Sequence, residues 1–392
     1  PFKFPPPDGF QPLNSANARP ETVIARPDHY VSAVLWTGNQ TVRSISTGNA
    51  PDLVWIKDRD QLHNHNLLDT VRGAPNLLQS DTTAAQITNS TDGLTSFNSD
   101  GFTLGVNVLG TQSYEMNKTG NDYVAWSWKA GGNKNTFNVD DVGYVSAAAA
   151  GLTGGSTAPN GASVGTKQGF SIIKWTGTGS GTSLGHGLSS SPDFVIVKSL
   201  ANAREWLVWH SSFGTASNTD YLYLDTNGSK GGSGAGGYWN GTAPTSTTFS
   251  VGDSAAVNTG GDFIAYLWHD VPGLQKFGKY IGNDDADGPY IELGFRPAII
   301  IIKRSDGSTN NWTLFDASRN TANVMGKQLY PNDAAAEADA TQDTHARVDF
   351  LSNGVKLRGS HGSVNADGGT FIYMAWAEAP AFNLYGAQSN AR

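Results

Sequence analysis

Apolar positions along this chain fall into many short runs of strand length, with none of the long three-to-four-residue spacing that marks amphipathic helices. Val195-Ile196-Val197 is apolar on consecutive positions, and turn residues flank the run. Such a run is typical of a strand covered on both faces, whereas the segment 171–175 mixes apolar and polar residues as an outer strand does. The pattern therefore predicts an all-β protein without long helices.

The same order of predicted strands recurs three times. Each copy has an aromatic residue shortly before Gly, a strand led by Pro, a strand ending in Asp or His, a further short strand, and a closing strand that ends in Trp. The strand-leading residues are Pro51, Pro192 and Pro297, and the closing residues are Trp128, Trp268 and Trp376. The separations are 77, 76 and 79 residues, a constancy that indicates three diverged copies of one module.

Each copy has the size and strand content of a β-sandwich or jelly-roll-like module with long Gly/Ser/Asn-rich loops. Pro at the start of a strand costs no ladder hydrogen bond, and the closing Trp is expected in the core, with ligand stacking as the alternative. The expected organisation is a Pro-rich lead-in over 1–28, module 1 over 29–132, an extended linker or arm over 133–168, module 2 over 169–273, module 3 over 274–382 and a tail over 383–392.

Composition narrows the function classes. The chain has 392 residues, 47 Gly and no Cys, so disulfides, thiolate metal sites and cysteine nucleophiles are excluded. Its formal net charge of −8 leaves no basic surface for nucleic acid, and no apolar run is long enough for membrane insertion. Because residue 1 is Pro, we expect a processed or truncated portion of a longer protein, or one without its initiator Met.

One turn is a candidate metal site. Asp284, Asp285 and Asp287 lie close together before Gly288, and closely spaced Asp oxygens before Gly resemble part of a calcium loop. A Glu at the distance that an EF-hand requires is missing, so a simple Asx turn is the alternative. Apart from this calcium candidate, the sequence predicts no cofactor.

Candidates for acid–base chemistry are scattered. They are His63, His65, Asp69, His269, Asp270, Glu292 and Glu378, and metal binding is an alternative for the first five. None stands beside a Ser in a nucleophile elbow, and the carboxylate separation that glycoside hydrolysis requires cannot be read from a sequence. We therefore expect no catalytic residues, with polysaccharide cleavage as the alternative.

Exposed aromatic and amide side chains in loops can stack on sugars and form hydrogen bonds with them. On this ground Trp239, Asn240, Asn283 and Asp284 are the candidate glycan-binding positions.

Several strings resemble repeat-containing virion structural proteins of marine bacteriophages such as cyanophages, a family of largely unknown function. The matching stretches are 51–57, 123–132, 287–290, 294–298, 329–332 and 349–354, and the likeness covers nearly the whole chain. The resemblance implies a component of the virion surface, in a tail fibre or appendage, for host attachment through a surface glycan or receptor, or for particle assembly with other virion proteins.

The resemblance carries no catalytic residues. Alternatives are a polysaccharide depolymerase of a phage appendage, a capsid decoration protein, and an extracellular lectin or filament subunit. Phage appendages are commonly symmetric oligomers, so a homo-oligomer is expected, with a trimer as the first choice. The sequence leaves open whether the three modules pack in a row or around a pseudo-threefold axis.

Overall fold

The computed structural model describes residues 24–88, 92–106, 115–213, 219–232, 237–307, 309–339, 346–381 and 390. Almost all regular structure is β-strand, with the short helix α1 (Gly362–Asn365) and the 3₁₀ turns η1 (Pro27–His29) and η2 (Ser211–Phe213), which confirms the all-β prediction. The lead-in over 1–28 and the tail over 383–392 lie largely outside the described residues. In the described part of the chain, no helix is long and apolar enough to cross a bilayer.

Module 1 consists of a main sheet and a smaller sheet. The main sheet has the order β1 (Val31–Thr37), β9 (Asp122–Trp128), β3 (Leu53–Asp58), β4 (Asn66–Asp69), β5 (Asn76–Gln79) and β6 (Ile87–Thr88). The smaller sheet has the order β2 (Arg43–Ser46), β8 (Gly101–Leu104) and β7 (Leu94–Asn98). Both sheets are antiparallel throughout, as short connections favour.

Module 2 repeats this arrangement. Its main sheet continues from β13 (Phe170–Thr176) through β20 (Asp262–Trp268), β15 (Phe194–Ser199), β16 (Leu207–His210), β17 (Asp220–Tyr223) and β18 (Gly231–Gly232). Its smaller sheet pairs β14 (Thr182–Gly185) with β19 (Thr248–Val251). The segment 133–168, expected to be a linker or arm, instead adds β12 (Gly161–Gly165), β10 (Phe137–Val139) and β11 (Val142–Tyr144) to the free edge of β13.

Among the described residues, module 3 has the main sheet with the fewest strands. Its order is β21 (Gln275–Ile281), β29 (Thr370–Pro380), β23 (Phe295–Arg304) and β24 (Thr313–Asp316). The smaller sheet has the order β22 (Tyr290–Glu292), β28 (Gly354–Leu357) and β27 (Val348–Leu351), and β25 (Lys327–Gln328) pairs with β26 (Ala338–Asp339). Pro297 lies at an irregularity of the β23–β29 ladder, where a residue without an N–H is tolerated.

The closing strand lies centrally in every main sheet and buries both of its faces. In β9, Tyr123 and Ala125 point into the core between the two sheets of module 1, while Val124, Trp126 and Trp128 point into a second core. This alternation follows from the period of two in a strand, and it explains why the strand is apolar at consecutive positions. Each main sheet is therefore a partition between two hydrophobic cores.

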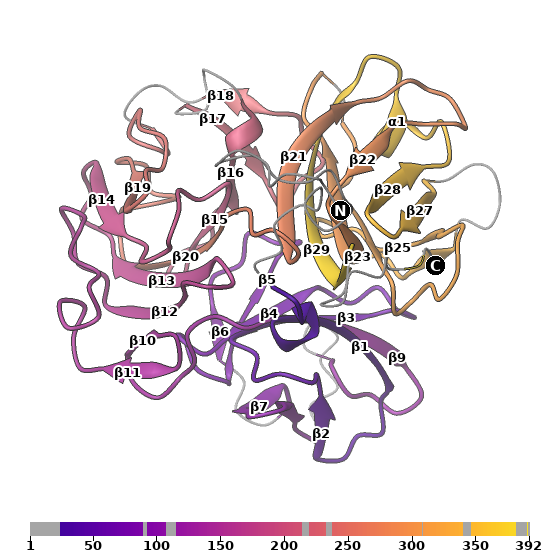
Figure 1. The fold of residues 1–392 in the computed structure, drawn as a ribbon. Helices are drawn as coiled ribbons and strands as arrows, with labels where there is room; N and C mark the ends of the chain where they lie inside the picture. Colours follow the sequence, from indigo (N-terminus) through magenta and orange to yellow (C-terminus); the bar gives the residue numbers. More distant parts are fainter. Residues whose placement is uncertain are drawn as a thin grey trace, which may run out of the picture.

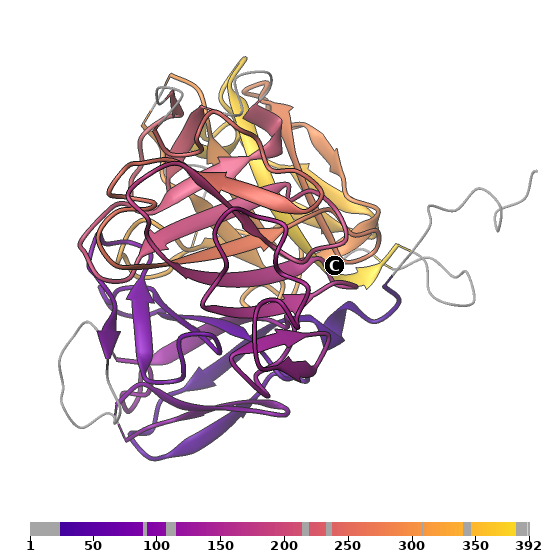
Figure 2. The same ribbon diagram turned by 90° about the vertical axis from the view of Figure 1, so that its left-hand side faces the viewer.

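The second core is shared by all three modules. Trp128, Trp268 and Trp376 are 2%, 3% and 1% exposed and meet pairwise, with ring centroids 5.3–6.3 Å apart and interplanar angles of 67–70°. Figure 1 shows module 1 below, module 2 to the left and module 3 to the right of this centre, with the smaller sheets outermost. Figure 2 shows the same closed arrangement from the side. The modules thus surround a pseudo-threefold axis, and the three Trp are core residues.

Candidate functional site

The three modules interlock through one repeated backbone contact. Each module sends a loop to the next one, where a backbone N–H donates to a carbonyl oxygen just after the Pro-led strand. The three bonds are Gln86 N to Leu200 O (2.9 Å), Lys230 N to Ser305 O (2.9 Å) and Glu337 N to Arg59 O (2.7 Å). They run from module 1 to 2, from 2 to 3 and from 3 back to 1. We call these places the 1–2, 2–3 and 3–1 junctions.

A deeper polar contact also repeats at each junction. Trp126 Nε1 donates to Asp316 Oδ2 at 2.9 Å across the 3–1 junction, and the Tyr266 hydroxyl donates to Asp69 Oδ2 at 2.7 Å across the 1–2 junction. At the 2–3 junction the acid is replaced by His210, whose Nε2 lies 3.4 Å from Tyr373 O. Buried polar groups usually find such partners, and here the partners belong to neighbouring modules.

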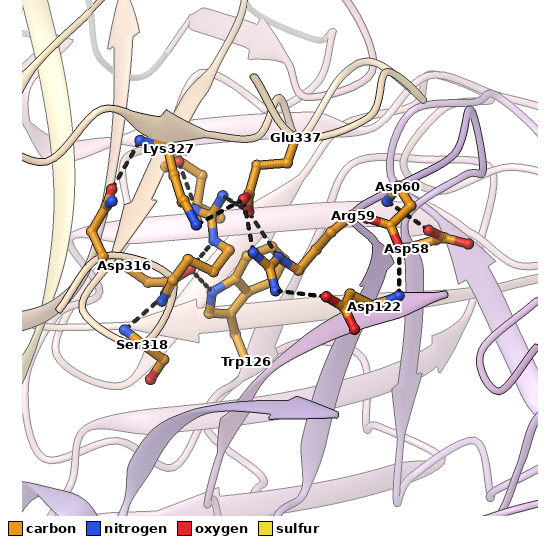
Figure 3. Close-up of polar contacts among 12 residues, drawn as sticks. Asp58, Arg59, Asp60, Asp122, Trp126, Asp316, Ser318, Lys327 and Glu337 are labelled. Atoms are coloured by element: carbon orange, nitrogen blue, oxygen red, sulfur yellow. Dashed lines mark hydrogen bonds and ion pairs between the residues drawn. The ribbon is translucent and has the colours of Figure 1, made fainter. Parts of the chain in front are cut away.

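The 3–1 junction contains a fully paired charge network (Figure 3). Arg319 forms an ion pair with Asp316 through Nε, donates from Nη2 to Leu314 O at 3.1 Å, and donates from Nη1 to Glu337 Oε2 at 3.1 Å. Glu337 also accepts two bonds from Arg59, at 2.9 and 2.8 Å. Although burial raises the pKa of Glu337, the bonds from Arg59 and the nearby Arg319 charge bring it below its usual value.

The 1–2 junction repeats the Arg–Asp geometry of the 3–1 junction, but it lacks the charges that Glu337 and Arg59 provide there. Arg72 forms an ion pair with Asp69 through Nε and donates from Nη2 to Leu67 O at 2.9 Å, as Arg319 does in module 3. The residues equivalent to Glu337 and Arg59 are Gln86 and Leu200, as the shared backbone bond shows. Arg72 Nη1 and Gln86 Oε1 are both buried without a hydrogen-bond partner. A guanidinium N–H that is paired in module 3 is therefore unpaired in module 1.

A cleft of about 480 Å³ opens over this place. Its lining residues are Arg72, Asn76, Gln86, Lys174, Leu200, Ala201, Gly261 and Asp262. The Lys174 ammonium lies 3.4 Å from the Asp262 carboxylate, and both side chains are partly exposed. Gln86 is held by one side-chain bond, from Nε2 to Asn76 Oδ1 at 3.2 Å. The cleft thus presents hydrogen-bond donors and acceptors beside a comparable area of apolar surface, which suits a ligand with both polar and apolar groups.

A second cleft, of about 330 Å³, lies where modules 2 and 3 meet. It brings Asp270 and Glu292 together in one lining, with Gln275 and Lys276. Burial, and then the nearby Asp193 charge, raise the pKa of Asp270 to about 7. Asp270 is solvent-accessible, and a carboxyl group that is partly protonated near neutral pH can donate a proton, so this cleft has one feature of a general-acid site.

The structure corrects the expectation for Trp239. The side chain is 3% exposed, lies in the core of module 2 and donates from Nε1 to Asp220 O at 2.8 Å. It therefore cannot stack on a glycan from an exposed loop. The neighbouring Asn240 is exposed, at a backbone φ of 52°.

The acidic turn near Gly288 is exposed and belongs to module 3, whereas Asn240 belongs to module 2. Asn283 Oδ1 accepts from Asp285 N, and Asp285 Oδ1 accepts from Asp287 N, at 3.1 and 2.8 Å. Asp287 also pairs with Lys356 at 2.8 Å. Asp284 is at a φ of 52° in this turn. These contacts are those of successive Asx turns, the alternative to a calcium loop.

A different group could hold a metal. Among the described residues, Asp58, His63 and Glu115 form a buried cluster of three side chains that could act as metal ligands. Asp58 Oδ2 lies 2.8 Å from His63 Nδ1, and Glu115 Oε2 lies 3.4 Å from His63 Nε2. His63 Nδ1 is therefore within hydrogen-bond distance of Asp58, whereas Glu115 Oε2 is buried without a hydrogen-bond partner. The sequence could not reveal this group, because Glu115 follows His63 only after 52 residues.

The other sequence candidates have structural partners. His65 Nδ1 accepts from Trp55 Nε1 at 3.0 Å, and burial lowers the pKa of His65 well below its usual value. Glu378 Oε2 lies 3.0 Å from Arg296 Nε. His269 Nδ1 lies 2.7 Å from Asp270 O. The structure therefore does not unite His63, His65 and Asp69 in one site.

Sequence reasoning missed Arg72 and Gln86. The available signal was the repeat itself, because Asp69 and Arg72 have the same three-residue spacing as Asp316 and Arg319. The equivalence of Gln86 and Glu337 was not visible in this way, because Gln86 follows Asp69 by 17 residues and Glu337 follows Asp316 by 21.

Comparisons with known proteins provide a family but no function. A family model described as a domain of unknown function matches residues 26–380. No curated protein and no solved structure matches the chain.

Proposed function

Since the chain belongs to the family of domains of unknown function DUF7483, whose model spans all three modules, we propose a function from its architecture: a non-catalytic structural protein of a phage particle. In this proposal it forms part of a tail fibre or appendage and contacts a host-surface glycan or another virion protein. Decoration of the capsid and a role as an extracellular lectin or filament subunit are the neighbouring alternatives.

The observation that carries this proposal is the closed ring of modules around one shared core. Because every main sheet is buried on both faces, the scaffold leaves the peripheral loops and junction clefts as the surfaces open to a partner. A rigid scaffold with variable loops is the usual arrangement for recognition. The sequence resemblance to marine phage virion proteins supplies the biological setting.

Immunogold labelling of phage particles that carry this gene tests the location. We expect antibody against the purified chain to label the tail or its appendages. Labelling of the capsid would favour decoration, and particles without label would contradict a virion role.

Binding of the purified chain to host cells tests attachment. We expect saturable binding that weakens in the loop variants Asn240→Ala and Asp284→Gly, because both side chains are exposed. Tight binding to other virion proteins alone would favour a purely structural role.

Light scattering checks the expected homotrimer, which would have three times the chain mass. Because the module interfaces are used within one chain, such a trimer would form through other surfaces.

The cleft between modules 2 and 3 favours one second candidate, a polysaccharide depolymerase. It contains two carboxyl groups, and Asp270 has a pKa raised to about 7 by burial and by Asp193. A reducing-end assay on host polysaccharide tests this candidate. Product release that is lost in Asp270→Asn and kept in Glu378→Gln would support it, and wild-type protein that releases no product would exclude it for that substrate.

A further inference from the structure

The internal repeat allows an unpaired cation in one module to be compared with its paired counterpart in another. Arg72 and Arg319 hold the same position in modules 1 and 3, and each pairs through Nε with the acid three residues earlier. Arg319 Nη1 meets the Glu337 carboxylate at 3.1 Å, whereas Arg72 Nη1 has no partner. Arg72 is 8% exposed, so bulk water does not satisfy this donor. An unpaired buried donor is costly unless a ligand uses it.

We propose that the cleft between modules 1 and 2 binds the carboxylate group of an acidic saccharide, such as a uronic acid, and that Arg72 Nη1 donates to that carboxylate as Arg319 Nη1 donates to Glu337. At the 1–2 junction the ligand carboxylate thus takes the role that the Glu337 carboxylate has at the 3–1 junction. Arg–carboxylate bonds are charge-assisted and geometrically specific, which makes this donor a recognition group.

Gln86 lies between the cleft and the guanidinium group in this proposal. It occupies the position of Glu337, and its Oε1 is buried without a partner. One side-chain bond, to Asn76 Oδ1, holds its amide, and Asn76 Oδ1 also accepts from Thr88 Oγ1 at 2.7 Å. Rotation of Gln86 therefore admits the carboxylate, turns Nε2 toward it as a second donor, and leaves Asn76 with a partner.

The rest of the cleft favours a sugar over an acidic peptide. Asn76, Lys174 and Asp262 provide donors and acceptors for hydroxyl groups around the proposed carboxylate position. The volume of about 480 Å³ is in the range of small-molecule sites, and the polar and apolar parts of the lining are about equal, which suits a sugar ring with hydroxyl groups at its edge and C–H groups on its faces. The proposed carboxylate binding depends on these residues and not on which particle or cell surface carries the chain.

Calorimetric titration of the full chain with three probes tests the proposal. The probes are tri-galacturonate, its uncharged methyl ester, and a hexamer of glutamate at the same ionic strength. We expect saturable binding of tri-galacturonate at one site per chain, with at least tenfold weaker binding of the ester. Absence of tri-galacturonate binding, equal binding of the ester, or preferential binding of the peptide would each overturn the proposal.

Gln86→Glu is the decisive variant, because it supplies an internal carboxylate to Arg72 as Glu337 does to Arg319. We expect it to fold, to melt no lower than the wild type, and to bind tri-galacturonate at least tenfold more weakly. Gln61→Glu is the matched control, because it adds the same charge on an exposed loop of the same module. Unchanged affinity in Gln86→Glu, or an equal loss in Gln61→Glu, would overturn the assignment of the site.

The double variant Arg59→Leu/Glu337→Gln performs the reverse exchange. It makes the 3–1 junction like the 1–2 junction and should raise the stoichiometry from one site to two. A folded double variant that still binds one ligand would contradict the role of the unpaired guanidinium. If this variant does not fold, the Gln86→Glu result alone decides.

Discussion

At the scale of single residues, the equivalent lysines Lys57, Lys198 and Lys303 are the most unusual buried groups. All three are 0% exposed, although each carries a charge and follows the apolar run of its Pro-led strand. Lys303 Nζ donates to Asn227 O at 3.0 Å and to Asn310 O at 2.7 Å, and Lys198 Nζ donates to Thr83 O of module 1 at 2.8 Å. Loop carbonyls therefore take the place of water, and in two cases they come from a neighbouring module.

This burial predicts a dependence of stability on pH. Burial lowers the pKa of Lys303 to about 8, whereas an unfolded lysine keeps its proton to about pH 10.4. Between these values the unfolded chain binds more protons, so the contribution of this residue to the free energy of unfolding rises with pH. From pH 7.5 to 9.5 we expect the wild type to gain about 2 kcal/mol relative to Lys303→Met.

Guanidinium-induced unfolding at the two pH values measures this gain. Lys279→Met is the control, because Lys279 is exposed on β21 and its removal should leave the pH dependence unchanged. A Lys303→Met difference that stays constant with pH would show that the ammonium is not desolvated.

At the scale of elements, the junctions are held by loop-to-strand contacts whose backbone part is constant and whose side-chain part varies. The same N–H to carbonyl bond occurs three times, but Glu337 is the one residue of its set that adds a carboxylate between two arginines. Its side chain is 10% exposed, and those of Arg59 and Arg319 are 13% and 0% exposed. Removing one partner of such a buried network leaves an uncompensated charge.

We therefore expect Glu337→Gln to lower the free energy of unfolding by about 2–4 kcal/mol. Chemical denaturation at neutral pH measures the loss. Glu292→Gln, on an exposed position of β22, should change stability by less than about 0.5 kcal/mol. Equal stability of Glu337→Gln and the wild type would mean that desolvation already offsets the ion pairs at the 3–1 junction.

At the scale of the whole molecule, the shared core couples the three modules. Trp268 stacks on Phe170 at 4.5 Å and on Phe194 at 5.3 Å within module 2, and it contacts Trp128 and Trp376 from the other two modules. Because each main sheet has one face in this core, no module can unfold without exposing the apolar surface of its neighbours. The chain should therefore unfold in one cooperative transition.

Trp268→Ala tests this coupling. We expect a loss of about 3–5 kcal/mol, as for other large-to-small core substitutions, with the single transition retained. Within each protein, variant or wild type, circular dichroism and tryptophan fluorescence should report one common midpoint. Separate transitions by the two probes would show that the modules fold independently.

Much of the fold could be predicted because it rests on local and repeated signals. Consecutive apolar positions identified strands with two buried faces, and the constant separation of Pro and Trp identified three related segments. Trp128, Trp268 and Trp376 were assigned to a core because large aromatic side chains are most stable there, and the structure places them there. Their Nε1 atoms are buried there without an acceptor.

The candidate site could not be predicted from single residues. Trp239 looked like a loop aromatic, but whether an aromatic residue in a Gly-rich segment points inward depends on the sheets around it. The arm over 133–168 looked like a linker because it carries Ala147-Ala148-Ala149-Ala150 and then Gly154-Gly155-Ser156, but the free edge of β13 provides partners for its backbone. Such partners come from distant parts of the chain, and composition does not record them.

The sequence alone determined the strand class, the triple repeat and the burial of the three closing Trp residues, because these depend on the period of a strand and on hydrophobicity. Only the tertiary structure decided that the three modules close into a ring, and this closure creates the junctions. Arg72 and Arg319 have the same local sequence pattern, but Glu337 reaches one of them and Gln86 lies beside the other. Whether a charge is paired depends on residues that folding brings from another loop.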